Sequence, residues 1–269
     1  KIPSLILPLK IYYRLQKLLR RILNCMPIIK QAVILCAGLG TRLRPLTDSM
    51  PKPMIQLLGK PLLEWNIEQF KKHGVTEFFI NLYYLPDVIR DYFCDGAKWG
   101  VKINYFQEKE ILGTAGGVKN FANMLDETFF LIYGDMLSLM DYIQMENEFA
   151  AYPDAIGMQR MQRTNNYADA DVAELAKDGS FARIHPKPHS EKYPNAYRMK
   201  GVFILKKEIL DFIPANTFYE LGKQLLPDVV SRGKKFYSYE CQDYTKGIDT
   251  MDKYQEVEEY LRKTKTLAG

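Results

Sequence analysis

The fold of this chain is most constrained by a short apolar segment that leads directly into a glycine-rich loop. The apolar segment is Ala32–Ala37 (AVILCA), and the loop occupies residues 38–53. A run of branched apolar residues that stops at glycine is typical of a buried parallel strand. Gly38 and Gly40 allow the backbone to turn tightly and to direct N–H groups at an anion, and Arg42 supplies positive charge beside them. The segment therefore predicts a strand followed by an anion-binding loop.

Strands and helices are predicted to alternate after this loop. The expected helices are Leu62–His73, Pro86–Phe93 and Thr114–Met124. The expected strands are Thr76–Tyr83, Val101–Phe106 and Phe129–Tyr133. Alternation of this kind predicts βαβ units and a mainly parallel sheet, so the fold class is α/β.

The second half of the chain has a different pattern, which begins with a hairpin. An Asp-Gly turn at residues 178–179 separates two apolar stretches, Val172–Leu175 and Phe181–Ile184. Further strands are expected at Tyr197–Leu205 and Lys235–Cys241, and further helices at Tyr219–Ser231 and Met251–Lys263. The sequence has no internal repeat and no low-complexity linker, so residues 31–269 are expected to form one continuous domain.

Residues 1–30 differ from the rest of the chain in charge. They contain seven Lys and Arg residues and no Asp or Glu, which leaves a net charge of −2 for residues 31–269 out of +5 for the whole chain. Apolar residues recur at helical spacing among these cations: Ile11, Leu15, Leu18 and Ile22. This basic amphipathic extension is expected to pack on the domain or on a partner subunit, and peripheral contact with an anionic membrane is the alternative. Its charges exclude a spanning helix, which needs ~20 predominantly apolar residues.

The cysteines and the charge of the domain indicate the compartment and the class of partner. The four cysteines are widely spaced: Cys25, Cys36, Cys94 and Cys241. They form no C-x-x-C pair, so neither a zinc site nor a dense disulfide framework is expected, and isolated thiols favour a cytoplasmic protein. The slightly acidic charge of residues 31–269 does not suggest nucleic-acid binding. A homodimer is compatible with the sequence.

The anion-binding loop belongs to a longer and more specific string. The string runs from GLGTRLRPLT (38–47) through PKPM (51–54) to GKPL (59–62). It lacks the third glycine of the dinucleotide fingerprint and the Gly-Lys-Ser/Thr ending of a P-loop. Over roughly residues 31–262 the chain resembles the sugar-1-phosphate nucleotidyltransferases, or nucleoside-diphosphate-sugar pyrophosphorylases. The resemblance implies a three-layer, Rossmann-like fold with a mixed, mainly parallel central sheet. It also implies that an NTP and a sugar 1-phosphate react to give an NDP-sugar and pyrophosphate.

The resemblance assigns roles to residues of two loops. The nucleotide phosphates would be held at Ala37, Gly38, Gly40, Thr41 and Arg42. Arg42 would also stabilise charge on the departing pyrophosphate, and Lys52 would bridge the attacking phosphate and the α-phosphate. The segment LGTAGG (112–117) matches the family's base-recognition segment, where small residues let the backbone reach the base: Gly113, Thr114 and Gly116.

A carboxylate site for Mg²⁺ is implied at the end of one predicted strand. Asp135 follows Phe129–Tyr133, and in the family this Asp holds the catalytic Mg²⁺. The ion takes one or two carboxylates together with phosphate oxygens. In simple register the second metal-binding Asp of the family falls on Gly247. Asp249, two residues along and on the same strand face, is the expected replacement.

Contacts to the sugar are implied at three later positions. Lys187, within HPKPH (185–189), matches a family Lys that grips the sugar phosphate, while Pro186 stands where the family has Glu. Gly201 matches a glycine whose backbone meets the sugar, and Glu220 matches an acid that binds sugar hydroxyls in many members. The HPKPH segment resembles the corresponding segment of enzymes that act on mannose or heptose 1-phosphates. This resemblance favours GTP as the nucleotide.

Two alternatives are compatible with the same motifs. A cytidylyl-, uridylyl- or thymidylyltransferase acting on another sugar or small phosphate would share the anion-binding loop of residues 38–53, which we term the phosphate loop. A catalytically silent homologue that binds a nucleotide sugar and regulates a partner is motivated by Pro186 and Gly247. His185 and His189 are expected to belong to a bent strand end, because the sequence offers no third metal ligand nearby.

Overall fold

The computed structural model describes residues 29–164, 170–189, 191, 193 and 196–268, with side chains described only up to residue 264. The predicted amphipathic helix within residues 1–30 therefore lies outside the described residues. Within the described part of the chain, no helix is both long enough and apolar enough to cross a bilayer.

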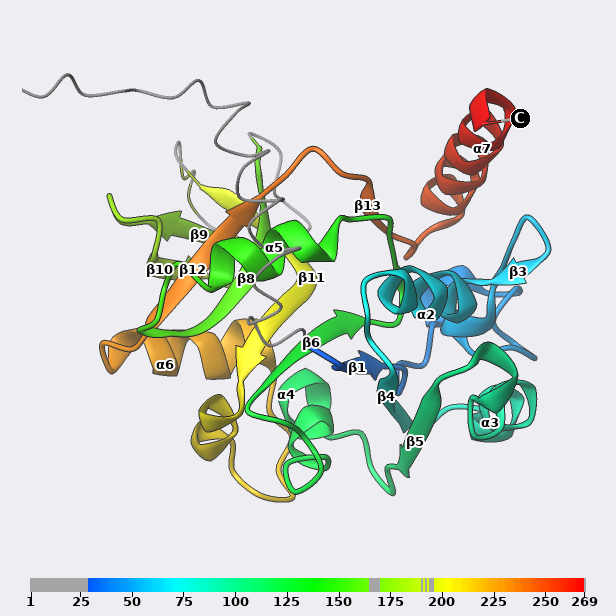
Figure 1. Ribbon diagram of the computed structural model, residues 1–269, viewed down its shortest axis with the longest axis horizontal. Coiled ribbons are helices and arrows are strands. Elements are labelled where there is room, and N and C mark those ends of the chain that lie inside the picture. Colours follow the sequence, from blue (N-terminus) through cyan, green and yellow to red (C-terminus); the bar gives the residue numbers. More distant parts are fainter. Residues whose placement is uncertain (1–28, 165–169, 190, 192, 194–195, 269) are drawn as a thin grey trace, which may run out of the picture.

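A mixed sheet forms the centre of the molecule (Figure 1). Its parallel part has the order β6-β1-β4-β5, with β1 at Gln31–Leu35, β4 at Glu77–Leu82, β5 at Lys102–Gln107 and β6 at Thr128–Tyr133. β11 (Tyr197–Lys206) runs antiparallel to β6 and joins it to the strands of the second half, which are β8 (Ala155–Arg163), β9 (Val172–Leu175), β10 (Phe181–His185) and β12 (Lys235–Glu240). The predicted α/β class with a mixed, mainly parallel sheet is confirmed.

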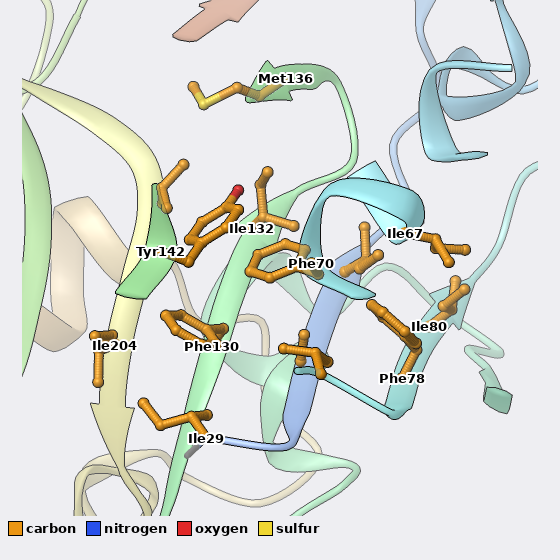
Figure 2. Packing of buried hydrophobic residues seen from close by; sticks show 14 of the residues in the cluster. Ile29, Ile67, Phe70, Phe78, Ile80, Phe130, Ile132, Met136, Tyr142 and Ile204 are labelled. Carbon is orange, nitrogen blue, oxygen red and sulfur yellow. The ribbon is translucent and has the colours of Figure 1, made fainter. Parts of the chain in front are cut away.

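Helices cover both faces of this sheet, which makes three layers. One face carries α2 (Leu62–Lys72), α3 (Pro86–Phe93) and α5 (Tyr142–Phe149), and the other carries α4 (Gly113–Lys119) and α6 (Leu226–Ser231). The alternation of side chains along β1 explains the arrangement, because Ile34 and Val33 point to opposite faces. Ile34 shares its cluster with Phe70 and Tyr142, whereas Val33 shares the other cluster with Val118. Figure 2 shows the first cluster, in which the Phe70 and Tyr142 rings stack with centroids 4.0 Å apart.

A third apolar cluster fixes the phosphate loop against the C-terminal helix. α7 (Met251–Ala268) contributes Val257 and Leu261, which pack with the fully buried Leu43 of the loop. Short pieces complete this region, namely the 3₁₀ turns Thr41–Leu43 and Lys52–Met54, and the paired strands β2 (Gln56–Leu57) with β3 (Lys60–Pro61) and β7 (Met136–Ser138) with β13 (Thr245–Gly247).

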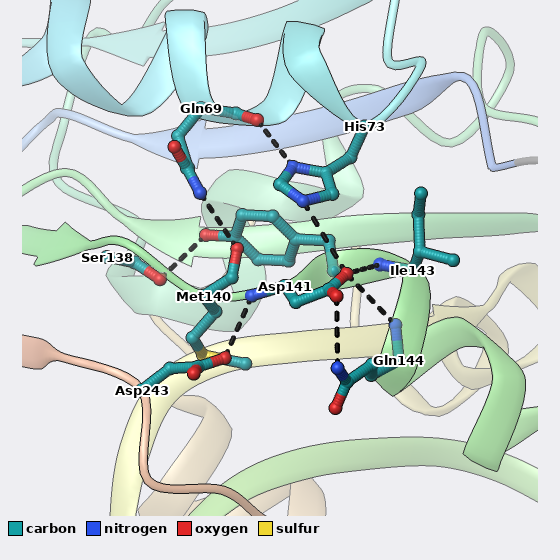
Figure 3. A network of polar contacts seen from close by, with 9 residues as sticks. Gln69, His73, Ser138, Met140, Asp141, Ile143, Gln144 and Asp243 are labelled. Atoms are coloured by element: carbon teal, nitrogen blue, oxygen red, sulfur yellow. Dashed lines mark hydrogen bonds and ion pairs between the residues drawn. The ribbon is translucent and has the colours of Figure 1, made fainter. Parts of the chain in front are cut away.

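A polar network holds the chain just beyond β7 (Figure 3). The Asp141 carboxylate caps α5 by accepting the N–H groups of Ile143 and Gln144, and the Asp141 N–H donates to the Asp243 carboxylate over 2.9 Å. The side-chain amide of Gln69 donates to the Met140 carbonyl over 2.9 Å. These bonds tie α2, α5 and the segment that precedes β13 together, and they restrain the strand that follows Asp135.

Several elements were not predicted, among them β7, β8, α5 and β13. The predicted helix Tyr219–Ser231 is also divided, because a π-helical turn at Leu221–Leu225 precedes α6. Pro227 has no N–H to donate within this segment, which disfavours a regular helix there.

Candidate active site

A cavity of about 450 Å³ opens at the carboxyl ends of the parallel strands β1 and β6. This is the edge at which open α/β sheets bind ligands, and the volume suits a small-molecule site. Most of the predicted site residues line it: Ala37, Gly38, Gly40, Thr41, Arg42, Lys52, Gly113, Thr114, Asp135 and Glu220. Segments far apart in sequence therefore meet around one space, as the resemblance implied.

The phosphate loop has a backbone conformation that requires glycine at one position. Gly40 has φ 66°, and its carbonyl accepts the Leu43 N–H over 3.0 Å and the Thr47 hydroxyl over 2.9 Å. A Cβ on Gly40 would stand 3.2 Å from Thr47 and 3.3 Å from Lys52. A Cβ on Gly38, in contrast, would meet no heavy atom within 4 Å beyond its chain neighbours, so space is free above its backbone.

Lys52 and Asp135 form the charged centre of the cavity. The Lys52 ammonium lies 2.6 Å from Asp135 Oδ2, and the two side chains are 10% and 35% exposed. Burial, followed by the charge of Asp135, raises the pKa of the Cys36 thiol far above its usual range, so Cys36 is an uncharged wall of the cavity. The centre therefore holds one cation and one hard oxygen ligand side by side.

Asp249 is brought close to this centre but is held by other cations. The Ile248 N–H donates to the Asp135 carbonyl over 2.8 Å, which places the residues after β13 beside Asp135. The Asp249 carboxylate pairs with Arg42 at 2.8 Å and with Lys253 at 2.7 Å, and Asp249 does not line the cavity. Burial alone would raise the pKa of Asp249, but Lys253, Arg42 and Lys52 outweigh it and hold that pKa below its ordinary value.

Two buried polar residues that the sequence analysis missed connect the phosphate loop to the predicted base-recognition segment, residues 112–117, which we term the base loop. Asn81 Oδ1 accepts the Cys36 N–H over 2.8 Å, and Asn81 Nδ2 donates to Glu108 Oε1 over 2.7 Å. Glu108 Oε2 then accepts the Leu112 N–H over 3.0 Å. Both residues line the cavity, and both are almost fully buried. Their positions at the ends of two parallel strands are the only sequence signal that could have identified them.

The glycines of the base loop serve packing as well as access. A Cβ on Gly113 would stand 2.7 Å from the Tyr219 carbonyl oxygen, and Gly113 has φ 74°. Gly116 does not line the cavity, and its N–H donates to the Tyr219 carbonyl over 3.1 Å. A Cβ on Gly117 would stand 2.6 Å from Asn81 Nδ2 and 3.0 Å from Glu108 Oε1.

We expect Gly117→Ala to disrupt the Asn81–Glu108 connection, because the added methyl group has no room beside two buried polar side chains. Alanine is ordinarily preferred to glycine in a helix by ~1 kcal/mol. The variant should nevertheless unfold at a lower temperature than the wild type and bind nucleotide at least ~10-fold more weakly, the effect of losing one good hydrogen bond. Circular dichroism and calorimetry measure both quantities, and a higher midpoint with unchanged binding would show that the methyl group is accommodated.

The predicted sugar-side residues are divided between the cavity and its surroundings. Glu220 lines the cavity and pairs with Lys223 at 2.9 Å. Lys187 does not line it, and its backbone N–H donates to Asp171 Oδ1 over 3.0 Å. Gly201 supports the cavity wall instead, since a Cβ there would stand 2.5 Å from the ring of Tyr133.

Asp171 is a further carboxylate that sequence reasoning missed on this side. A Cβ on Gly222 would stand 2.5 Å from Asp171 Oδ2, so the glycine allows this close approach. The two histidines of HPKPH make separate contacts, His185 with Glu174 at 2.7 Å and His189 with the Ala170 carbonyl at 2.7 Å. Among the described residues, no group of three His, Cys, Asp or Glu side chains is arranged to hold a metal ion.

Comparison with known families agrees with this geometry. The family model described as "Nucleotidyl transferase" matches residues 31–264, which include every residue of the cavity. The chain belongs to the nucleotidyl transferase family. The resemblance that began with the phosphate-loop string is confirmed.

Relatives within the nucleotidyl transferase family differ in the substrates that their names give. A UTP–glucose-1-phosphate uridylyltransferase from Synechocystis sp. is 34% identical over 224 residues, covering 77% of this chain and 57% of the relative. A mannose-1-phosphate guanylyltransferase from Mycobacterium tuberculosis is 28% identical over 225 residues, covering 83% and 62%. The chain thus spans little more than half the length of these two relatives.

Solved structures share the fold of this nucleotidyl transferase. HddC from Yersinia pseudotuberculosis superposes with a TM-score of 0.72 at 24% identity, covering 87% of this chain and all of that one. A UDP-glucose pyrophosphorylase complexed with UDP-glucose gives a TM-score of 0.75 at 21% identity, covering 88% and 99%. At these identities the match establishes the three-layer architecture alone.

Proposed function

We propose that this chain is an enzyme that transfers the nucleotidyl group of an NTP to a sugar 1-phosphate and releases pyrophosphate. The observation that carries the proposal is the meeting, in one cavity, of the phosphate loop, the Lys52–Asp135 pair and the base loop. Family membership supports the same class of reaction.

The barrier of such a reaction is electrostatic, because two anions must come together. The attacking oxygen belongs to a phosphate that is already ionised, so a strong general base is not required. Lys52, buried at the centre of the cavity, can contact both phosphates and offset their repulsion. The N–H groups between Gly38 and Thr41 can hold the triphosphate, and Arg42 at the rim can neutralise the departing pyrophosphate.

The donor set at Asp135 suits Mg²⁺ bound together with nucleotide. Asp135 supplies one carboxylate beside Lys52, and Mg²⁺ is usually held by one or two carboxylates plus substrate phosphate oxygens. When bound, the ion would neutralise phosphate charge and orient the triphosphate. We propose Asp135 as its principal ligand. Asp249 is the candidate second ligand, and it would have to release Arg42 or Lys253 to take that role.

We expect Arg42→Ala to lower kcat about 100-fold, the scale of losing one charge-stabilising contact. Arg42 is 65% exposed and paired with Asp249, so the fold should tolerate its loss. Arg44→Ala is the matched control, because Arg44 lies in the same loop, pairs with Asp48 and does not line the cavity. A pyrophosphate-release assay should find Arg44→Ala close to wild type, and equal rates for the two variants would remove Arg42 from the mechanism.

For the substrates, we favour GTP with a mannose or heptose 1-phosphate. The HPKPH segment and the relative named as a guanylyltransferase support this choice, while other relatives are named as uridylyltransferases. The experiment is a pyrophosphate-release assay of five NTPs against mannose, heptose and glucose 1-phosphates. A highest kcat/KM with UTP and glucose 1-phosphate would change the substrates and keep the reaction. Tight calorimetric binding of a nucleotide sugar without turnover in any pair would favour the silent regulatory homologue.

A further inference from the structure

A second cavity lies apart from the candidate active site and shares no lining residue with it. Its volume is about 710 Å³, and it is formed by the end of β8, the start of β11, the end of β12 and the segment that enters β13. These three strands lie side by side in the second half of the sheet (Figure 1). Nothing in the proposed reaction uses this space.

The lining of the second cavity is dominated by cations. Five basic side chains line it: Arg160, Arg163, Arg198, Lys200 and Lys246. Three carboxylates also line it, and each of them either has a bonding partner or is exposed to solvent. Glu256 pairs with Lys246 at 2.6 Å, Asp243 accepts the Asp141 N–H, and Glu240 is exposed.

Arg160 is the most deeply buried of these five cations. It is only 4% exposed, and its guanidinium donates to the carbonyl groups of Met161 and Cys241. Its Nε is buried and has no hydrogen-bond partner in the described part of the chain. Two carbonyl groups fix the orientation of the guanidinium without neutralising it, and a buried charge in this state is costly.

Lys200 adds a second, half-buried charge beside Arg160. Burial, and then the charges of Arg198, Arg160, Lys246 and Lys253, lower the pKa of Lys200 to about 8. Although Lys246 pairs with Glu256 and Lys253 with Asp249, the five basic and three acidic side chains of the lining leave the cavity with a net positive charge. A bound anion would relieve this repulsion and favour the protonated amine.

We propose that the second cavity is a binding site for a small polyvalent oxyanion, a phosphate ester or a short polyphosphate, held by Arg160 and Lys200. Charge-assisted hydrogen bonds from a fixed guanidinium and an ammonium are the usual way in which proteins hold phosphate. The volume exceeds that of bare phosphate and falls in the range of small-molecule sites, which leaves room for the remainder of an ester. This binding site is independent of the reaction proposed for the first cavity.

Calorimetric titration of the full chain with inorganic pyrophosphate, without divalent metal, tests the site. The wild type should show two classes of site. Lys52→Met should weaken pyrophosphate binding only at the first cavity. Lys200→Met should weaken pyrophosphate binding at the second cavity at least ~10-fold, the effect of removing one charge-assisted hydrogen bond. Lys206→Met is the matched control, because Lys206 lies at the far end of β11 and bonds the Pro153 carbonyl. Lys200→Met should also unfold no earlier than the wild type, since its neighbours repel Lys200.

The pH dependence gives an independent readout with inorganic sulfate, whose charge is constant between pH 7 and 9. Affinity at the second site should fall over this range as Lys200 loses its proton, and Lys200→Met should show no such fall. A wild type with one class of site that only Lys52→Met removes would overturn the proposal. The proposal would also be overturned if both classes of site in Lys200→Met bound pyrophosphate with wild-type affinity.

Discussion

Replacing Lys52 by methionine is expected to reduce kcat by about 10²- to 10³-fold, because its ammonium is a cation buried against Asp135 at the centre of the first cavity. In the proposed reaction, the Lys52 ammonium would contact both phosphates fully only as they approach each other. We therefore expect kcat and kcat/KM to fall together, as they do when an interaction specific to the transition state is lost. Steady-state kinetics at saturating nucleotide measures both constants.

A second lysine provides a closely matched control for this prediction. Lys60 pairs with Glu68 at 2.6 Å, the same distance as Lys52 to Asp135, and neither residue of this outer pair lines the cavity. Lys60→Met should keep near-wild-type turnover. If Lys52→Met and Lys60→Met lowered kcat equally, the loss would be a general effect of breaking an ion pair, and the assigned role of Lys52 would be wrong.

Asp135→Asn is expected to lower kcat by at least about 10²-fold and to raise the Mg²⁺ concentration needed for half-maximal rate. The substitution keeps the shape of the side chain and removes its charge. It also leaves the Lys52 ammonium, whose side chain is 10% exposed, without a counter-ion. The Asn amide oxygen can still accept a hydrogen bond from this ammonium but cannot neutralise it. We therefore expect a loss of about 1–3 kcal/mol in the free energy of unfolding, the scale of a hydrogen bond to a charged group.

The double variant Lys52→Met/Asp135→Asn separates catalysis from folding. Removing both charges should restore much of the free energy of unfolding lost by Asp135→Asn, since no charge is then left unpaired. Turnover should stay as low as in the slower single variant. Urea unfolding and the pyrophosphate-release assay measure the two effects. Recovery of activity together with stability would show that Asp135 supports the fold and not the reaction.

The phosphate loop and the parallel half of the sheet were predictable because local sequence determines them. β1 contains the apolar run Ala32–Leu35, and the glycines that follow meet demands of the local backbone, as the φ of 66° at Gly40 shows. The lining of one cavity by Arg42, Lys52 and Asp135 also followed from the motif.

Features set by tertiary pairing were not predictable in this way. β8 carries Gln159 and Arg160 among its apolar residues, yet both are buried because β11 and β12 flank the strand on its two edges. The Asn81–Glu108 connection depends on two strand ends becoming neighbours, which no local pattern reveals. Asp249 was placed by motif register, and its ion pairs with Arg42 and Lys253 follow from the packing of α7.

The measurement that tests the central claim most directly is a crystal structure of the full chain with a GTP analogue and Mg²⁺ at saturating concentration. We predict the triphosphate along the backbone between Gly38 and Thr41, the base beside Gly113, and Arg42 turned from Asp249 toward the terminal phosphates. A nucleotide bound elsewhere, with the first cavity empty and Arg42 still paired to Asp249, would contradict the proposed reaction site.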